Sequence, residues 1–362
     1  MFSREGGHSG GGPWYGGCLV EISLTDPIHT PGARLWPWER WIFGLMNDER
    51  DLPFLRLSLK LLVLNVPFAA LLYVPGVYRW WLGAAYFLGS SFLFLGPFIL
   101  MLHNTSHRPL FKRRYRVLNL VVPWALGPFF GETPDSYFAH HVGMHHAENN
   151  LAGDLSSTLR FRRDSLGHFL RYFCRFFFIG WAELTQYHWK KKRYKMLRRF
   201  WLGELTFYAL VATLAWWQFY PTLWVFIVPY VFTRVMMMCG NWAQHAFVDL
   251  ATPESPYRNS ITCVNSAYNR KCFNDGYHIG HHVKPTMHWS EMPGDFLANV
   301  ERYRNENAIV FRKLDYFTIW LLLMVHQYGL LARFYVELDT ARPKSQSEVV
   351  ALLRSRTQPQ PA

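Results

Sequence analysis

The chain has little cysteine and little acidic charge for its size. Five cysteines are scattered over 362 residues without a C-x-x-C pair, which argues against a disulfide framework and suits a reducing compartment. Twenty-five Asp and Glu stand against 38 Lys and Arg, which leaves a net charge of +13. The Gly-rich N-terminus has no early apolar core, so we expect no cleavable signal peptide.

Aromatic residues, by contrast, are abundant. The chain carries 16 Trp, 19 Tyr and 29 Phe, more than an ordinary soluble domain of this size holds. Its mean hydropathy is nevertheless only −0.04, too low for a chain that lies wholly in lipid. We therefore expect a few membrane spans and a large polar part outside the bilayer.

Two pairs of apolar segments predict two transmembrane hairpins. Leu61–Tyr78 is uncharged and ends at a Pro75-Gly76 turn, and Trp80–Leu102 gives 23 uncharged positions. A bilayer core of ~30 Å needs roughly 20 helical residues. Phe200–Tyr220 and Thr222–Gly240 form the second pair, each with one charged residue, so about four spans are predicted.

Shorter apolar segments predict helices at the membrane surface. Val117–Gly131 is too short to span and is interpreted as a re-entrant or interfacial helix. His168–Trp181 mixes arginines with aromatics, as a helix lying on a membrane does. Phe317–Leu331 is interpreted as a peripheral helix, and a cluster of Trp36, Trp38 and Trp41 is expected at the membrane interface.

The distribution of basic residues predicts the orientation. Residues 103–199, between the hairpins, hold 17 Lys and Arg against 6 Asp and Glu. The positive-inside bias places this loop and both termini in the cytosol, in the endoplasmic reticulum if the source is eukaryotic and in the inner membrane if it is bacterial. Because membrane topology accounts for the charge, we expect membrane lipids as partners and no nucleic acid.

Nine of the 16 histidines fall into four tight groups, which read HNTSH, HVGMHH, NWAQH and HIGHH. Spacings of three and four place side chains on one helix face, and imidazole is a common ligand of iron, copper and zinc. The two hairpins bring the groups together beneath the bilayer, next to apolar spans that offer a lipid chain a path. The candidate metal ligands are His103, His107, His141, His145, His146, His245, His278, His281 and His282.

The remaining histidines are expected to serve surface or packing roles. His140 is left open, because it adjoins the second group. The others are His8, His29, His168, His188, His288 and His326.

These groups resemble the three histidine boxes of the membrane fatty acid desaturase and hydroxylase superfamily. The similarity extends over about residues 57–300 and includes the segment from Phe273 to His282, followed by Pro285. It implies two iron ions, O2 as co-substrate, and an extra ligand position in which Asn241 reaches a metal through water. It also implies an all-α integral membrane fold of two helical hairpins under a cytosolic helical cap.

The resemblance also suggests the division of the chain. Residues 1–56 are expected to form a cytosolic N-terminal segment, residues 57–335 the desaturase domain, and residues 336–362 a polar, disordered tail.

Two departures from the family pattern matter. Three residues separate His141 from His145, which places His146 about 140° from His141 on an ideal helix, so a local distortion at Gly143 is expected. No fused cytochrome b5 domain is recognisable, so electrons must come from a small external protein of the cytochrome b5 or ferredoxin type. The basic run Lys190–Arg199 is either its docking site or an anchor on anionic lipid.

The leading functional hypothesis is O2-dependent desaturation of the fatty acyl chain of a lipid or an acyl thioester. A hydroxylase or ketolase acting on a fatty acyl, sphingoid or isoprenoid chain is the first alternative. A non-catalytic membrane metal-binding protein is the second.

Overall fold

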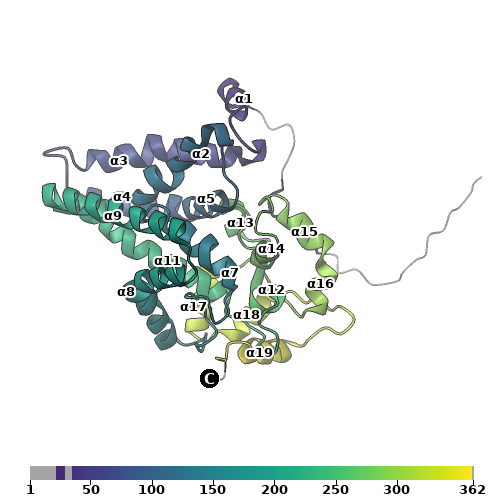
Figure 1. Cartoon of the computed structure of the whole chain (residues 1–362). Coiled ribbons are helices and arrows are strands. Elements are labelled where there is room, and N and C mark those ends of the chain that lie inside the picture. The colour runs from purple at the N-terminus through teal and green to yellow at the C-terminus, as the bar shows by residue number, and fades with distance from the viewer. Residues whose placement is uncertain (1–21, 29–34, 361–362) are drawn as a thin grey trace, which may run out of the picture.

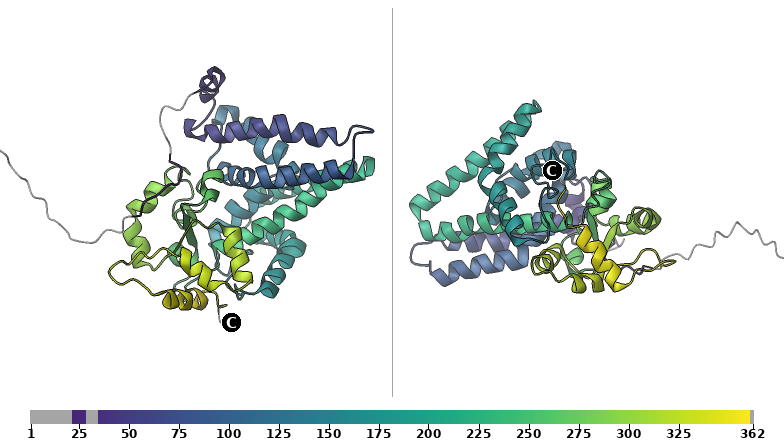
Figure 2. Two further views of the ribbon diagram at one scale, coloured as in Figure 1. Left: turned by 180° about the vertical axis from the view of Figure 1, so that it is seen from behind. Right: turned by 90° about the horizontal axis from the view of Figure 1, so that it is seen from below.

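The computed structural model describes residues 22–28 and 35–360, and these residues are mostly helical. Long helices run side by side away from a compact cap of shorter elements (Figures 1 and 2). Of the histidines expected at the surface or in packing, His8 and His29 lie outside the described ranges, as does one of the five cysteines, Cys18.

Three helical segments are long and apolar enough to cross a membrane, namely Glu49–Leu71, Trp80–His107 and Phe219–Gln244. α9, the predicted third of four spans, is not among them, since it begins in basic residues and contains Glu204. The structure thus confirms a mostly helical chain with three candidate membrane spans, while four spans stay a prediction. The first segment comprises η1 (Glu49–Asp51), α2 (Leu52–Lys60), η2 (Leu61–Asn65) and α3 (Val66–Leu71), and the second α4 (Trp80–Gly89), η3 (Ser90–Leu95) and α5 (Gly96–His107). The third comprises α10 (Phe219–Thr222), η8 (Leu223–Ile227) and α11 (Val228–Gln244), whereas α9 (Tyr194–Trp217) stands apart from these three.

Each of these three segments contains a π-helical turn just before a proline. Pro67, Pro97 and Pro229 follow η2, η3 and η8, respectively. In an α-helix a proline ring clashes with the carbonyl four residues earlier and leaves it without a donor. That carbonyl lies inside the π turn each time, so the wider turn absorbs the proline and the helix continues.

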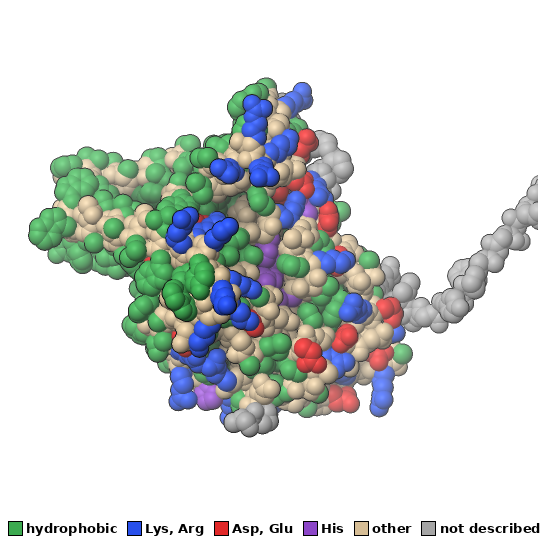
Figure 3. All heavy atoms as spheres, in the orientation of Figure 1, with side chains coloured by type: hydrophobic (Ala, Val, Ile, Leu, Met, Phe, Trp, Pro, Cys, Tyr) green, Lys and Arg blue, Asp and Glu red, His purple; other side chains and the backbone are tan. Residues whose placement is uncertain are grey.

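The ends of the long helices remote from the cap form an almost uncharged arm (Figure 3). Large apolar side chains such as Trp80, Trp216 and Trp217 are mostly exposed there. Such a surface suits contact with lipid chains and not with water.

The cap is helical, apart from a two-stranded parallel sheet that the all-α prediction missed. β1 (Ile261–Val264) pairs with β2 (Ile309–Arg312), and Cys263 lies opposite Phe311. Alternation is invisible in these strands because nearly every position is buried. The cap helices are α1 (Pro37–Phe43), η4 (Arg113–Leu120), η5 (Val121–Leu126), η6 (Gly127–Phe130), α6 (Ser136–His140), η7 (His141–His145), α7 (His146–Glu148), α8 (Leu166–Lys190), α12 (Pro256–Asn259), α13 (Ala267–Lys271), α14 (His278–Val283), α15 (Met292–Ala298), α16 (Val300–Asn305), α17 (Tyr316–Met324), α18 (Tyr328–Phe334) and α19 (Gln346–Ser355).

The short apolar segments are helical, as expected. Residues 117–131 fold into η4, η5 and η6, and residues 317–331 into α17 and α18. The segment predicted at 168–181 is the first part of the longer α8. Trp36 and Trp41 on α1 are largely exposed, while a salt bridge of 2.6 Å between Glu39 and Arg56 holds α1 to α2.

The prediction of a disordered tail was wrong for the described residues. A capping box of Ser345 and Glu348 starts α19, whose buried Val349 and Leu353 pack on the core around β1 and β2. The chain beyond α19 is held by Arg163, a buried guanidinium that donates to the carbonyls of Arg356, Gln358 and Ala246. Composition hid this order, because the tail has few apolar residues among many polar ones.

Candidate metal centre

The first histidine box is the last turn of α5. His103 and His107 stand one turn apart, and the helix ends at His107 because Arg108 is extended. His103 is buried, and its Nδ1 lies 3.2 Å from Oδ1 of Asp275. The end of this long apolar helix therefore presents both imidazoles to the cap.

The second box contains the expected distortion, in the form of the π turn η7. A π turn repeats at i→i+5, so His146 returns to the face of His141, and their Nε2 atoms lie 3.0 Å apart. Gly143 makes room for the turn, since a Cβ there would meet Cε1 of His188 at 3.1 Å. The 140° mismatch calculated for an α-helix therefore disappears.

The third box forms α14, a short and largely buried helix. His278 and His282 are one turn apart, with Nε2 atoms 3.0 Å from each other. His281 projects to a different side and approaches the first two boxes.

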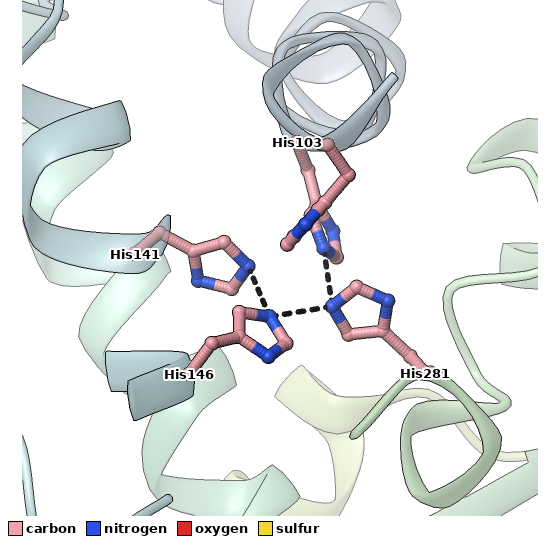
Figure 4. Close-up of side chains that lie close together, drawn as sticks. His103, His141, His146 and His281 are labelled. Atoms are coloured by element: carbon pink, nitrogen blue, oxygen red, sulfur yellow. Dashed lines mark hydrogen bonds between the residues drawn. The ribbon is translucent and has the colours of Figure 1, made fainter. Parts of the chain in front are cut away.

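The structure collects the nine histidines into two clusters, within each of which the ligand atoms lie within 4.8 Å of one another. In the first cluster, Nε2 of His281 is 2.8 Å from Nε2 of both His103 and His146 (Figure 4). In the second, Nε2 of His278 is 3.3 Å from Nε2 of His245. The first cluster comprises His103, His107, His141, His146 and His281, and the second His145, His245, His278 and His282.

Hydrogen bonds at the far side of three rings direct lone pairs into the clusters. Nδ1 of His145 donates to Asp154 at 2.6 Å, and Nδ1 of His245 donates to the carbonyl of Asn259 at 2.7 Å. Nδ1 of His103 donates a hydrogen bond to Asp275 in the same way. A neutral imidazole has one N–H and one lone pair, so each Nε2 then faces inward as an acceptor.

These inward-facing Nε2 atoms have no hydrogen-bond donor opposite them, and a metal ion would bind to their lone pairs. Nε2 of His107 is buried without any hydrogen-bond partner among the described residues. Lone pairs that face one another at 2.8–3.3 Å repel unless a cation lies between them. The donor set of each cluster therefore fits one divalent transition metal.

Burial favours the neutral, metal-binding form of several cluster imidazoles. It lowers the pKa of His141, His278, His281 and His282 well below the usual range, and the neighbouring histidines lower it further. The pKa of His245 falls to about 3 for the same reasons. A protonated ring cannot be a ligand, so this shift favours metal binding over protonation.

The family model for fatty acid desaturases matches residues 78–312. The chain belongs to the fatty acid desaturase family. None of the curated proteins compared with it matches significantly.

In this desaturase-family chain, both clusters open on a largely apolar cavity of about 560 Å³. Histidines of both clusters line it, together with Phe92 and Leu95 from the second apolar segment. Met236, Met237 and Met238 of α11 contribute unbranched side chains that adapt to irregular shapes. The cavity therefore connects the metal clusters with side chains of the apolar helices.

Asn241 lines this cavity but belongs to neither cluster. Its amide Nδ2 donates to the carbonyl of Ser156 at 3.1 Å and to the hydroxyl of Tyr172 at 2.7 Å. Its contact with a metal through water stays a prediction.

Among the histidines assigned to packing, two are buried in polar contacts. His188 supports box two through a bond of 3.1 Å to the carbonyl of Ala139. His288 joins Asp48 and Asp51 in a third group, but Arg50 and Arg108 pair with these carboxylates and make it an ion-pair network. His140 lines the cavity, and its Nε2 has no partner among the described residues.

Sequence reasoning missed Asp154 and Asp275, which orient the ligands. Each lies close to a box in the chain, Asp154 after box two and Asp275 just before His278. Partners of this kind are characteristic of metal-bound histidine, so a search for acids beside the boxes could have found both.

Proposed function

We propose that this protein is a membrane di-iron enzyme that uses O2 to desaturate a fatty acyl chain of a lipid or an acyl thioester. The observation that carries the proposal is the apolar cavity with two all-nitrogen histidine clusters in its wall. The family is typically di-iron, and a site of neutral ligands beside a hydrocarbon channel suits oxidation of an unactivated CH2. All nine clustered histidines are proposed iron ligands, and Asn241 is proposed to act through water.

The bound irons would supply the reduction of O2 and the abstraction of hydrogen from the chain. The protein's own residues do the rest. Asp154, Asp275 and the Asn259 carbonyl hold the rings in the binding tautomer. The apolar wall orders the chain and excludes water from the reacting carbons.

The overall reaction fixes what must be delivered. Removal of two hydrogens from adjacent carbons, with reduction of O2 to two waters, consumes two electrons and two protons from outside. Insertion of one oxygen into a C–H bond, the hydroxylase alternative, consumes the same. The two outcomes therefore differ only in the product.

Lipid analysis of cells with and without the protein tests the proposal. New double bonds are expected, with about two iron ions per purified chain. New hydroxyl or keto groups would identify a hydroxylase or ketolase instead. Unchanged lipids in the presence of bound metal and an active donor would favour a non-catalytic metal-binding protein.

We further propose that an acidic electron donor, of the cytochrome b5 or ferredoxin type, docks beside box two. Lys190, Lys191 and Lys192 are exposed where α8 meets α9. Next to them, Arg193 donates to the carbonyl of Gly143 inside η7, and Lys191 lies 3.3 Å from Glu148. Figure 3 shows Lys and Arg side chains on the same face as a surface opening in which histidine atoms are visible.

We also propose the orientation in which this basic loop and both termini face the cytosol. A glycosylation acceptor inserted near Gly76 should then be modified in the endoplasmic reticulum. An acceptor near Lys192 should stay unmodified. The reverse pattern would show that the protein has the opposite orientation in the membrane.

A further inference from the structure

A second, smaller cavity adjoins the metal cavity and is named here the side chamber. It has a volume of about 100 Å³ and lies among α8, α9, α11 and the residues that lead into α6. Tyr137, His140, Phe176 and Met237 line both cavities, so the two cavities meet at these side chains. The side chamber has room for a few waters or one small polar group.

The side chamber contains several ionisable side chains, although its lining is mostly apolar and it lies among apolar helices. Glu132, Glu204 and Arg234 line it, and Glu204 and Arg234 belong to helices with long apolar stretches. An ionisable side chain in such a place is costly and in general has a function. Two of the three have partners: Glu204 accepts from Thr133 and Ser136 at 2.5 Å, and Arg234 donates to the carbonyl of Gly131 at 2.6 Å.

The wall that carries Glu132 is built rigidly into the molecule. The segment 131–136 passes between α9 and α11 so closely that a Cβ at Gly203 would collide with the carbonyl of Pro134. Gly131, at φ +74°, is equally close to the backbone of Pro229. An ion pair of 2.7 Å between Asp135 and Arg199 fixes the segment further. The side chamber is therefore a preformed feature of the fold.

Two buried polar atoms in this wall have no partner among the described residues. They are Oε1 of Glu132 and Nε2 of His140, and both residues line the side chamber. A buried polar atom without a hydrogen bond is destabilising and calls for an explanation. Two such atoms on residues that line one small cavity point to a bound polar group.

We propose that the side chamber binds a hydroxyl group carried by the substrate chain. This inference rests on the proposed function and narrows the substrate to hydroxylated aliphatic chains. A hydroxyl both donates and accepts, so it can pair with Glu132 and with His140 at once. A large headgroup exceeds the 100 Å³ of the side chamber.

The arrangement also predicts selectivity along the chain. Because His140 belongs to both cavities, a hydroxyl in the side chamber places neighbouring carbons in the metal cavity beside box two. The position of the hydroxyl on the chain then determines which carbons lie at the metal centre and react.

Ligand binding to the full-length protein in detergent tests this without turnover. The probes are octadecanoic acid and a set of octadecanoic acids with one hydroxyl at successive positions. Binding of each probe is measured through the change in tryptophan fluorescence. At one position, or two adjacent ones, the hydroxyl should tighten binding about five- to hundredfold, as pairing of buried polar groups does. Equal affinity for all positions would mean that the side chamber holds only water, and would overturn the inference.

Two substitutions and one control sharpen the test. Glu132→Leu and His140→Phe should each reduce the hydroxyl preference to less than about threefold, because each removes one partner. Glu183→Gln is the control, since this carboxylate also lines the side chamber but is already paired with Arg175 at 2.6 Å, so the hydroxyl preference should not change. A preference that survives both substitutions contradicts the assignment.

The two proposals fail in different ways. Binding and oxidation of the unsubstituted chain without any hydroxyl preference removes this inference and leaves the proposed function intact. Failure of every chain to bind, in protein that holds its metal, removes both.

Discussion

Adjacent histidines have different roles at this site. His145 and His146 are neighbours in the chain, yet His146 belongs to the first cluster and His145 to the second. His281 and His282 divide in the same way. Each cluster therefore depends on residues from at least two boxes, and a single substitution tests one cluster at a time.

Substitution of one histidine from each cluster should abolish activity. His281→Ala and His145→Ala each remove a buried ligand and leave an incomplete donor set, so each variant should lose at least one metal and nearly all turnover. Metal analysis and lipid product analysis measure this. His168→Ala, outside both clusters, is the control, and full activity in His281→Ala would refute the site assignment.

Glu132 should make stability depend on pH. Burial raises its pKa to about 7 from 4.5, so the folded protein holds a proton that the unfolded chain releases. Its contribution is fully present below pH 4.5 and is lost as the pH rises towards 7, by about 3 kcal/mol at most. Glu132→Gln should therefore melt higher than the parent at pH 7.5 and similarly at pH 4.5, and equal melting at both values would contradict the raised pKa.

The histidine ligands could be predicted from the sequence, and there is a physical reason why the other residues of the site could not. The histidines were found because ligand spacing within a helix is local and is written in consecutive residues. Asp275 acts on His103 from 172 positions away, a pairing created only by the tertiary fold. The unpartnered atoms of Glu132 and His140 are equally invisible in a sequence, because burial decides that they matter.

At the scale of elements, the π turn decides whether box two works. η7 accommodates one more residue than an α-helical turn would, and His141 and His146 converge because of it. The sequence disclosed the mismatch, but only the packing of Gly143 against His188 shows how it is resolved.

Changes in the length of box two should have opposite consequences. Deletion of Val142 would leave H-x2-HH, in which an ordinary α-helix places the first and last histidines one turn apart, as α14 does with His278 and His282. This variant should keep most of its metal. Insertion of one alanine after Val142 would separate the ligands around the helix, so this variant should lose its metal. Equal metal content in the two variants would refute the role of the π turn.

The corner between α8 and α9 predicts how electrons arrive. Charge reversal at Lys190 and Lys192 should slow turnover with a protein donor several-fold at low ionic strength, and less at high salt, because steering acts within a Debye length of ~8–10 Å. Turnover with a small chemical reductant should not change. Reversal at Arg270 and Lys271, exposed on α13, is the matched control.

Equal losses with both reductants, or a failure of membrane insertion alone, would identify the run as a lipid anchor. The sequence left both roles open, since a basic run beside a span is typical of either. The contact of Arg193 with η7 is what favours docking.

At the scale of the whole molecule, the C-terminal residues help to hold the metal site together. Arg163 joins the tail to the loop after box two, and in that loop Thr158 donates to the carbonyl of His245 at 2.8 Å. Asn150 links the same loop to Asn259, whose carbonyl orients His245. Disorder was predicted here from polar composition, although the capping box of Ser345 and Glu348 was a readable helix signal.

Truncation after Lys344, or Arg163→Ala, should therefore destabilise the protein and loosen the second cluster. Each change leaves buried carbonyls without donors, or a buried guanidinium with fewer acceptors, at roughly 1–3 kcal/mol for each group. The melting temperature and the metal content should fall together. Arg162→Ala, which removes a half-exposed pair with Asp164, should do neither.

The division of neighbouring histidines between the clusters also restricts how the protein can evolve. A small rotation of η7 or α14 that improved one cluster would move the adjacent ligand of the other, because the peptide bond joins His145 to His146 and His281 to His282. Neither half can drift towards a different metal or geometry by itself. Diversification of such a protein is therefore expected in the cavity wall and the side chamber, where residues change what is bound without moving the backbone that carries the ligands.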